Sequence, residues 1–137
     1  MPRRNHKVEL IARVPLFAGC SKRELARVAS LADELDVPAG RELTVEGRSG
    51  REFCVLVSGT ADVRRRGRRV ATLGDGDFFG EIALILDAPR SATVVTSSAA
   101  RLLVIERTAF RHLLETLPSL QTKVLEALAV RLAAESL

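Results

Sequence analysis

Apolar residues near the N-terminus recur at the three- and four-residue spacing of an amphipathic helix. One stripe spans residues 8–14 and stops at Pro15, which cannot continue a helix. A second stripe follows Ser21 and Glu24, whose three-residue spacing is the signature of a capping box. The pattern predicts two short helices within residues 5–32.

From residue 34 onward the apolar period shortens, and glycines divide the chain into short runs rich in β-branched residues. Runs of this kind, separated by turn residues, are typical of β-sandwiches and barrels. The predicted strands are residues 34–37, 42–46, 53–57, 60–65, 69–73, 93–96 and 101–105. They make residues 33–106 an antiparallel β-barrel of jelly-roll type, interrupted by one short helical segment at residues 80–84.

Helical spacing returns after the last predicted strand. Thr108 is expected to cap a helix whose apolar face ends at Pro118, and a further helix is expected from Ser119 almost to the C-terminus. Two helices therefore fill residues 107–137. No repeat, linker or low-complexity tract interrupts the pattern, so the sequence predicts one domain over residues 1–137, a mainly β fold with flanking helices.

Composition narrows the class of protein. The 137 residues are enough for one hydrophobic core, and 47% of them are apolar. The chain has no run of about 18 apolar residues and no export signal, so the cytoplasm is the expected location. Cys20 and Cys54 lack metal-ligand spacing, and Cys54 lies in an apolar run where a buried thiol is expected.

A good part of the formal net charge of +4 lies in the arginine-rich run at residues 64–69, which surrounds Gly67. Such a run could contact nucleic acid or anionic lipid. Strand-like segments flank it, however, and the chain has no Trp or Tyr and only five Phe to stack on bases. We therefore expect the solvated tip of a β-hairpin, and no nucleic-acid contact by this chain alone.

Candidate chemistry gathers in the segment between the fifth and sixth predicted strands. Gly80 precedes the short helical segment, and because it has no Cβ atom an anion can approach the backbone amides there. Arg90 can hold the same anion from the other side with charge-assisted hydrogen bonds. Glu81 would repel a bare phosphate, so its presence indicates a neutral donor attached to the anion. A sugar hydroxyl fits that description.

Residues 79–93 resemble the phosphate-binding cassette of the cyclic-nucleotide-binding domain family, of the catabolite activator protein and protein kinase A regulatory subunit type. Nearly the whole chain follows the layout of that family. The resemblance implies that Glu81 binds the ribose 2′-hydroxyl, that Arg90 binds the cyclic phosphate, and that Gly80 and Ala83 offer backbone amides.

The same resemblance implies a wider site. Ser91 is expected near the phosphate or the base edge, and Ala92 is expected to add a backbone contact. A purine face gains free energy by leaving water, so apolar strand residues are expected beneath the base, with a C-terminal arginine stacked on it. The expected base contacts are Val63, Val70 and Ala71, and the stacking arginine is Arg131. Phe79 and Ile82 complete the set of expected ligand-binding residues.

Catalysis finds little support in the sequence. His6 and His112 lie in helical segments, so the strands offer neither a cupin-type histidine cluster for a metal nor a base for a serine or cysteine nucleophile. We expect a non-enzymatic module without a cofactor or metal, whose ligand is cyclic AMP or cyclic GMP. The apolar base contacts do not choose between the two.

Three functions remain compatible with this sequence. The first is a sensor that binds a cyclic nucleotide reversibly and signals by rearranging its C-terminal helices. The second is the sensory half of a transcription regulator that lacks its DNA-binding part. The third is an interaction module that keeps the fold without a ligand and uses Leu125, Leu128 and Leu132 as a homodimer or partner surface.

Overall fold

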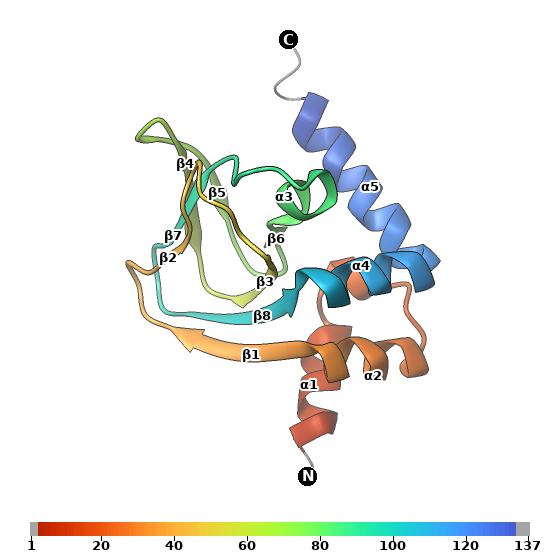
Figure 1. Cartoon of the computed structure of the whole chain (residues 1–137). Helices are drawn as coiled ribbons and strands as arrows, with labels where there is room; N and C mark the ends of the chain where they lie inside the picture. The colour runs from red at the N-terminus through yellow and green to blue at the C-terminus, as the bar shows by residue number, and fades with distance from the viewer. Residues whose placement is uncertain (1–2, 134–137) are drawn as a thin grey trace.

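The computed structural model describes the backbone of residues 3–133 and the side chains of residues 6–82 and 84–133. Strands occupy one half of the molecule and helices the other (Figure 1). The helices are α1 (Arg3–Ala12), the 3-10 turn η1 (Pro15–Phe17), α2 (Lys22–Leu31), α3 (Glu81–Leu86), α4 (Arg107–Thr116) and α5 (Pro118–Ala133). The strands are β1 (Ala32–Val37), β2 (Glu42–Thr44), β3 (Glu52–Ser58), β4 (Ala61–Arg65), β5 (Arg68–Leu73), β6 (Phe78–Phe79), β7 (Thr93–Thr96) and β8 (Ala100–Glu106).

The strands form two antiparallel sheets, in the orders β1-β8-β3-β6 and β2-β7-β4-β5. Buried side chains from both sheets meet between them, namely Val37, Cys54, Leu56, Ala61, Phe79, Val94, Ala100 and Leu102. The jelly-roll layout with flanking helices is confirmed. The closed barrel is corrected to a sandwich, because the edge strands of one sheet do not pair with those of the other.

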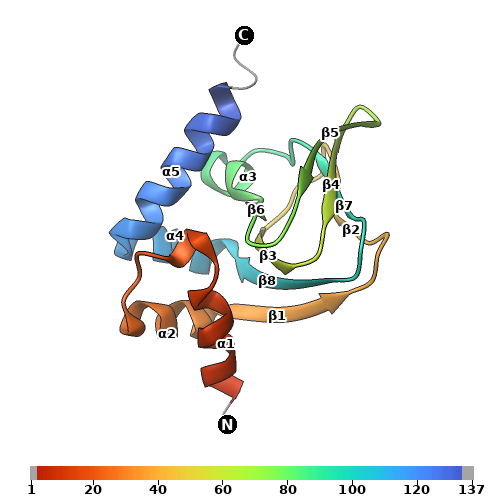
Figure 2. The same cartoon turned by 180° about the vertical axis from the view of Figure 1, so that it is seen from behind.

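Strand β3 contributes to two separate cores. Phe53 and Val55 point toward the helices, whereas Cys54 and Leu56 point into the space between the sheets, because side chains alternate along a strand. Phe53 stacks on Phe110 of α4, with 4.2 Å between the ring centroids. Helices α1, α2, α4 and α5 gather on this outer side of the first sheet (Figure 2), so the helices from both ends of the chain share one core.

The predicted element boundaries need a few corrections. The capping box of Ser21 and Glu24 is confirmed at the start of α2. The predicted cap at Thr108 is wrong: β8 runs directly into α4, so Glu106 occupies the capping position and Thr108 lies inside the first turn. Helix α1 begins at Arg3, and η1 and β6 were not predicted because two or three residues are too few to show a period. Residues 134–137 of the expected last helix lie outside the described residues.

The arginine-rich run forms the predicted hairpin between β4 and β5. Arg66 and Gly67 at its tip both have left-handed backbone angles, with φ of 52° and 76°. Two consecutive positive φ angles are what a two-residue type I′ turn requires. The tip is thus a tight turn with exposed arginines beside it.

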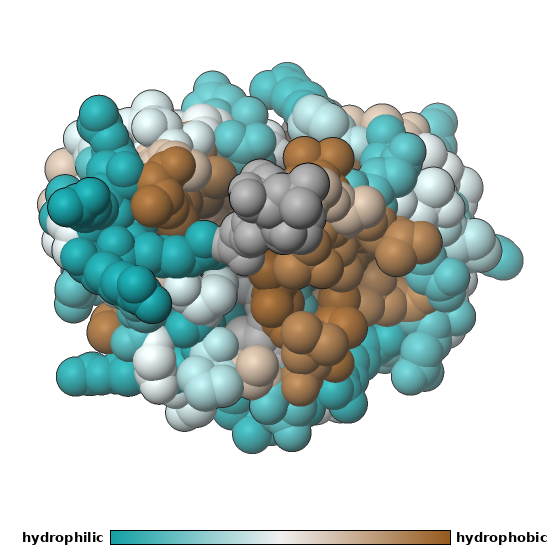
Figure 3. All heavy atoms as spheres, turned by 90° about the horizontal axis from the view of Figure 1, so that it is seen from above, coloured by the Kyte–Doolittle hydropathy of each residue, from teal (hydrophilic) through white to brown (hydrophobic). Residues whose placement is uncertain are grey.

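Helix α3 stands between the second sheet and α5 in both views of the fold (Figures 1 and 2). Seen from above, apolar atoms gather on the surface beside the end of α5 (Figure 3). The exposed large apolar residues of these two helices are Leu86, Leu125, Val130 and Leu132, which we call the α3–α5 patch. Leu128, which the sequence grouped with Leu125 and Leu132, is partly buried against the helical core. In residues 3–133 no helix is long and apolar enough to cross a membrane.

Candidate functional site

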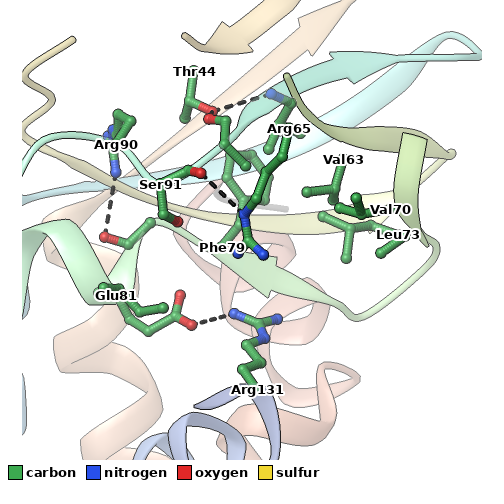
Figure 4. Close-up of a pocket in the computed structure, with 15 residues that line it drawn as sticks. Thr44, Val63, Arg65, Val70, Leu73, Phe79, Glu81, Arg90, Ser91 and Arg131 are labelled. Atoms are coloured by element: carbon green, nitrogen blue, oxygen red, sulfur yellow. Dashed lines mark hydrogen bonds and ion pairs between the residues drawn. The ribbon is translucent and has the colours of Figure 1, made fainter. Parts of the chain in front are cut away.

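A cavity of about 370 Å³ opens between the second sheet, the start of α3 and the last turns of α5 (Figure 4). Its size is within the range of small-molecule sites. The lining residues are Thr44, Val63, Arg65, Val70, Ala71, Leu73, Phe79, Gly80, Glu81, Ile82, Arg90, Ser91, Ala92, Val94 and Arg131. The cavity therefore brings together residues that are far apart in the sequence, and it has charged groups at one end and an apolar wall along the strands.

Gly80 forms the junction between β6 and α3, and its backbone excludes any other residue. Its φ is +100°, a left-handed value that side chains rarely tolerate. A Cβ atom there would lie 2.7 Å from the carbonyl oxygen of Glu52 and 2.8 Å from Nη1 of Arg90. The glycine thus allows the cassette backbone, the neighbouring strand and the arginine to pack together.

Arg90 is buried, with only 6% of its surface exposed. Its guanidinium donates to the carbonyl oxygens of Glu52, at 2.7 Å, and Gly80, at 3.3 Å. Both acceptors are neutral, so among the described side chains the charge has no carboxylate partner. Gly50 leaves the space for this arrangement, because a Cβ atom there would lie 2.0 Å from Nε of Arg90. A buried cation without a counterion is suited to an anionic ligand.

Glu81 is the most deeply buried acid of the site, with 1% of its surface exposed. Its Oε1 pairs with the guanidinium of Arg131 from α5. Its Oε2 is also buried and has no hydrogen-bond partner among the described residues. An unsatisfied buried carboxylate oxygen carries a desolvation penalty, which a hydroxyl donor entering the cavity would relieve.

Arg131 links the C-terminal helix to the site. Besides pairing with Glu81, it donates to the carbonyl oxygen of Phe78, and its guanidinium carbon lies 4.8 Å from the centre of the Phe78 ring. The sequence expectation was an arginine stacked on a purine. In the structure the arginine lies over the Phe78 ring and is paired with Glu81, and its stacking on a purine stays a prediction.

The remaining expected residues fall on the walls of the same cavity. Val63 lies on β4 and is half-buried, whereas Val70 and Ala71 on β5 are exposed. Phe79, Ile82, Ser91 and Ala92 line the cavity near the cassette, and Ala83 belongs to α3.

Four lining residues were missed by sequence reasoning, namely Thr44, Arg65, Leu73 and Val94. Thr44 connects two strands, because its hydroxyl donates to Ala92 O and accepts from the amide of Val94. Arg65 had a signal that was available, since it follows Val63 by two residues on the same strand and so shares its face. Leu73 had the same signal, because it follows Ala71 by two residues on β5. Thr44 and Val94 depend on strand pairing that no local pattern reveals.

The charge of Arg90 also reaches a neighbouring thiol. Burial raises the pKa of Cys54 to about 12, and the nearby Arg90 charge acts in the opposite direction with a smaller effect. Cys54 pairs with Phe79 across β3 and β6, directly behind the cassette. The thiol is therefore neutral at physiological pH and belongs to the core, and among the described residues no group of His, Cys, Asp and Glu could hold a metal ion.

Comparison with known proteins agrees with this geometry. Residues 34–117 match the family model described as the cyclic nucleotide-binding domain. A cAMP-dependent protein kinase regulatory subunit from Neurospora crassa is 33% identical over 129 residues, which cover 91% of this chain and 34% of the relative. The chain thus spans about a third of the length of the curated relatives it matches.

Solved structures share the same fold. The catabolite activator protein of Thermus thermophilus superposes with a TM-score of 0.78 at 28% identity, covering 88% of this chain and 59% of that one. A structure described as Sp-2Cl-cAMPS bound to PKAR CBD2 superposes with a TM-score of 0.82 at 24% identity, covering 98% of this chain and 92% of that one. The second likeness concerns the fold alone.

Proposed function

This chain belongs to the cyclic nucleotide-binding domain family, and from that premise we propose that it binds cyclic AMP or cyclic GMP reversibly in the cavity beside α3. The single observation that supports this best is that, within the described part of the chain, one cavity contains both a buried cation without a counterion and a buried carboxylate oxygen without a hydrogen-bond donor. Arg90 is a buried cation with only carbonyl partners, and Glu81 is a buried carboxylate with one unpartnered oxygen. A cyclic phosphate fused to a ribose that carries a free 2′-hydroxyl would supply the anion for Arg90 and the donor for Glu81.

The roles follow from the charges of the ligand. Arg90 would exchange its weaker carbonyl contact for the phosphate, with Gly80 giving close access to the cassette backbone. Oε2 of Glu81 would accept from the ribose 2′-hydroxyl. The base would lie along Val63, Val70 and Ala71, which form an apolar wall on the second sheet.

The function we infer is binding, without catalysis and without a cofactor. The curated relatives are named as regulatory subunits, which supports a regulatory role. A cytoplasmic location and a downstream protein partner form part of the same proposal.

Ligand binding in the cavity would be signalled to the rest of the protein through α5. Arg131 bonds to Glu81 on one side and lies over the Phe78 ring on the other, so a ligand that changes the hydrogen bonding of Glu81 also changes what holds α5. The α3–α5 patch lies on the outer surface of the same two helices and offers an apolar surface to a homodimer or partner protein.

The test is isothermal titration calorimetry with cyclic AMP and cyclic GMP on the parent and on Arg90→Ala. The parent should bind at least one of the two, and Arg90→Ala should bind at least about tenfold more weakly, since losing about 1.4 kcal/mol of interaction does that. Arg101→Ala is the matched control, because Arg101 lies on β8 outside the cavity and pairs with Asp36. A parent that binds neither nucleotide, or an Arg90→Ala variant with unchanged affinity, would overturn the proposal.

A further inference from the structure

A third guanidinium, besides those of Arg90 and Arg131, enters the cavity from the strand side. Arg65 is partly buried at the end of β4, and its Nε donates to the carbonyl oxygen of Ser91 at 3.1 Å. Figure 4 shows its side chain reaching across the cavity, with the guanidinium between Ser91 and the wall that carries Val63 and Val70. The bond to Ser91 fixes the direction of the group.

Arg90 and Arg65 enter the cavity from different elements. Arg90 is held against the carbonyls of Glu52 and Gly80, at the cassette end. Arg65 belongs to the second sheet and shares the strand face of Val63, two residues earlier. It therefore lies between Ser91 of the cassette and the apolar wall, beside the place where the proposed function puts the base.

An arginine in that position recognises a particular kind of base edge. Guanidinium is donor-only, with five N–H groups in a planar fork, and remains charged at any relevant pH. Guanine presents two adjacent acceptors, O6 and N7, which match a bidentate arginine, whereas adenine presents an amino donor in place of O6. When a guanidinium faces adenine, its N–H groups oppose the N–H groups of the 6-amino group, and donors on both sides lack an acceptor.

We propose that Arg65 is a specificity-determining residue that reads the O6 and N7 edge of a purine, so that the cavity prefers cyclic GMP over cyclic AMP. The inference rests on the proposed function, because it assumes that a cyclic nucleotide occupies the cavity. Arg65 would add discrimination between the two bases, which the cassette does not supply because the phosphate and the ribose are common to both nucleotides.

Competition binding with three ligands tests the base preference without any substitution. Cyclic IMP keeps O6 and N7 but lacks the 2-amino group of guanine, so it isolates the edge that Arg65 reads. The parent should bind cyclic GMP and cyclic IMP at least about tenfold more tightly than cyclic AMP, the discrimination expected of one good bidentate contact. A parent that prefers cyclic AMP, or that groups cyclic IMP with cyclic AMP, overturns the inference.

The substitution Arg65→Met then assigns the preference to the residue. It should remove most of the preference by weakening cyclic GMP and cyclic IMP while leaving cyclic AMP nearly unchanged. Arg64→Met is the matched control, because Arg64 is exposed on the other face of β4 and pairs with Asp62. Circular dichroism melts confirm that both variants are folded.

The outcomes separate this inference from the proposed function. If Arg65→Met weakens all three ligands equally, Arg65 acts as a second phosphate contact and the base-reading role is wrong, while the proposed function stands. If the parent binds none of the three, the proposed function fails and the inference falls with it.

Discussion

The geometry around Arg90 depends on two residues that have no side chain. Gly80 accepts the left-handed backbone and the close approach of Glu52 O, and Gly50 gives room for the guanidinium itself. The two glycines have different consequences when replaced. A Cβ atom at Gly80 meets backbone, which cannot yield easily, whereas one at Gly50 meets the flexible end of a side chain.

The substitution Gly50→Ala should therefore leave the fold intact and displace the guanidinium of Arg90. We expect cyclic-nucleotide affinity to fall at least about tenfold, equivalent to about 1.4 kcal/mol, with the melting temperature little changed. Gly74→Ala is the control, because nothing lies within 4 Å of its added Cβ atom and its φ is not left-handed. The measurement is calorimetric titration of both variants with cyclic nucleotide. Full affinity in Gly50→Ala would show that binding does not require the guanidinium position seen here.

Glu81 allows a test of the ribose contact. Glu81→Gln replaces a charged acceptor with a neutral one, and the difference between charged and neutral hydrogen bonds is about 1 kcal/mol, or roughly fivefold in affinity. The parent's preference for the nucleotide over its 2′-deoxy analogue should fall by about that factor. The measurement is the ratio of the two dissociation constants in each protein. An unchanged ratio would remove Glu81 from ribose recognition.

At the scale of elements, strand β3 contributes buried side chains to both hydrophobic cores. Its alternating side chains separate the helical core from the core between the sheets, and Cys54 is its contribution behind the cassette. The folded thiol has a pKa of about 12, raised by burial from the ordinary value near 9. The unfolded chain therefore loses this proton at lower pH than the folded chain does.

Stability should fall as pH rises above about 9, because the folded state retains a proton that the unfolded state releases. Between pH 8 and pH 10.5 the contribution of Cys54 is on the order of 1–2 kcal/mol, at 1.36 kcal/mol for each pH unit between the two pKa values. Urea unfolding at both pH values should show a smaller pH-dependent loss in Cys54→Ala than in the parent. Equal losses would mean that the thiol ionises as readily in the fold as in the unfolded chain.

The elements also show what sequence patterns can and cannot predict. Gly80, Glu81 and Arg90 could be found because their chemistry lies within one short segment, and the capping box of α2 because it is a local hydrogen-bond exchange. The closed barrel was wrong because closure depends on pairing between edge strands. The contact of Arg131 with Glu81 joins residues fifty positions apart, and the tertiary placement of α5 beside α3 determines it.

At the scale of the whole molecule, Arg131 connects the cavity to the C-terminal helix α5. Helix α5 is buried at its start through Leu120 and Val124, but its later turns reach the cavity through Arg131 and expose Val130 and Leu132. A change at the ligand site would thus move the less firmly packed end of α5 while the buried start stays in place.

Ligand binding should therefore change the amide chemical shifts of residues 119–133, with the largest changes near Arg131. In Arg131→Met the shifts of the cassette should still change on ligand addition, whereas those in α5 should change much less. Two-dimensional amide spectra of both proteins, with and without cyclic nucleotide, measure this. If α5 is unaffected in the parent, the proposed transmission is wrong.

The start of α5 also touches the N-terminal part of the chain. The hydroxyl of Ser119 donates to the carbonyl of Gly19 at 3.3 Å, and a Cβ atom at Gly19 would lie 2.9 Å from that of Ser119. The start of α5 is thus held against the loop between η1 and α2. A change in this loop would therefore reach α5 at its buried first turn, at the opposite end of the helix from Arg131.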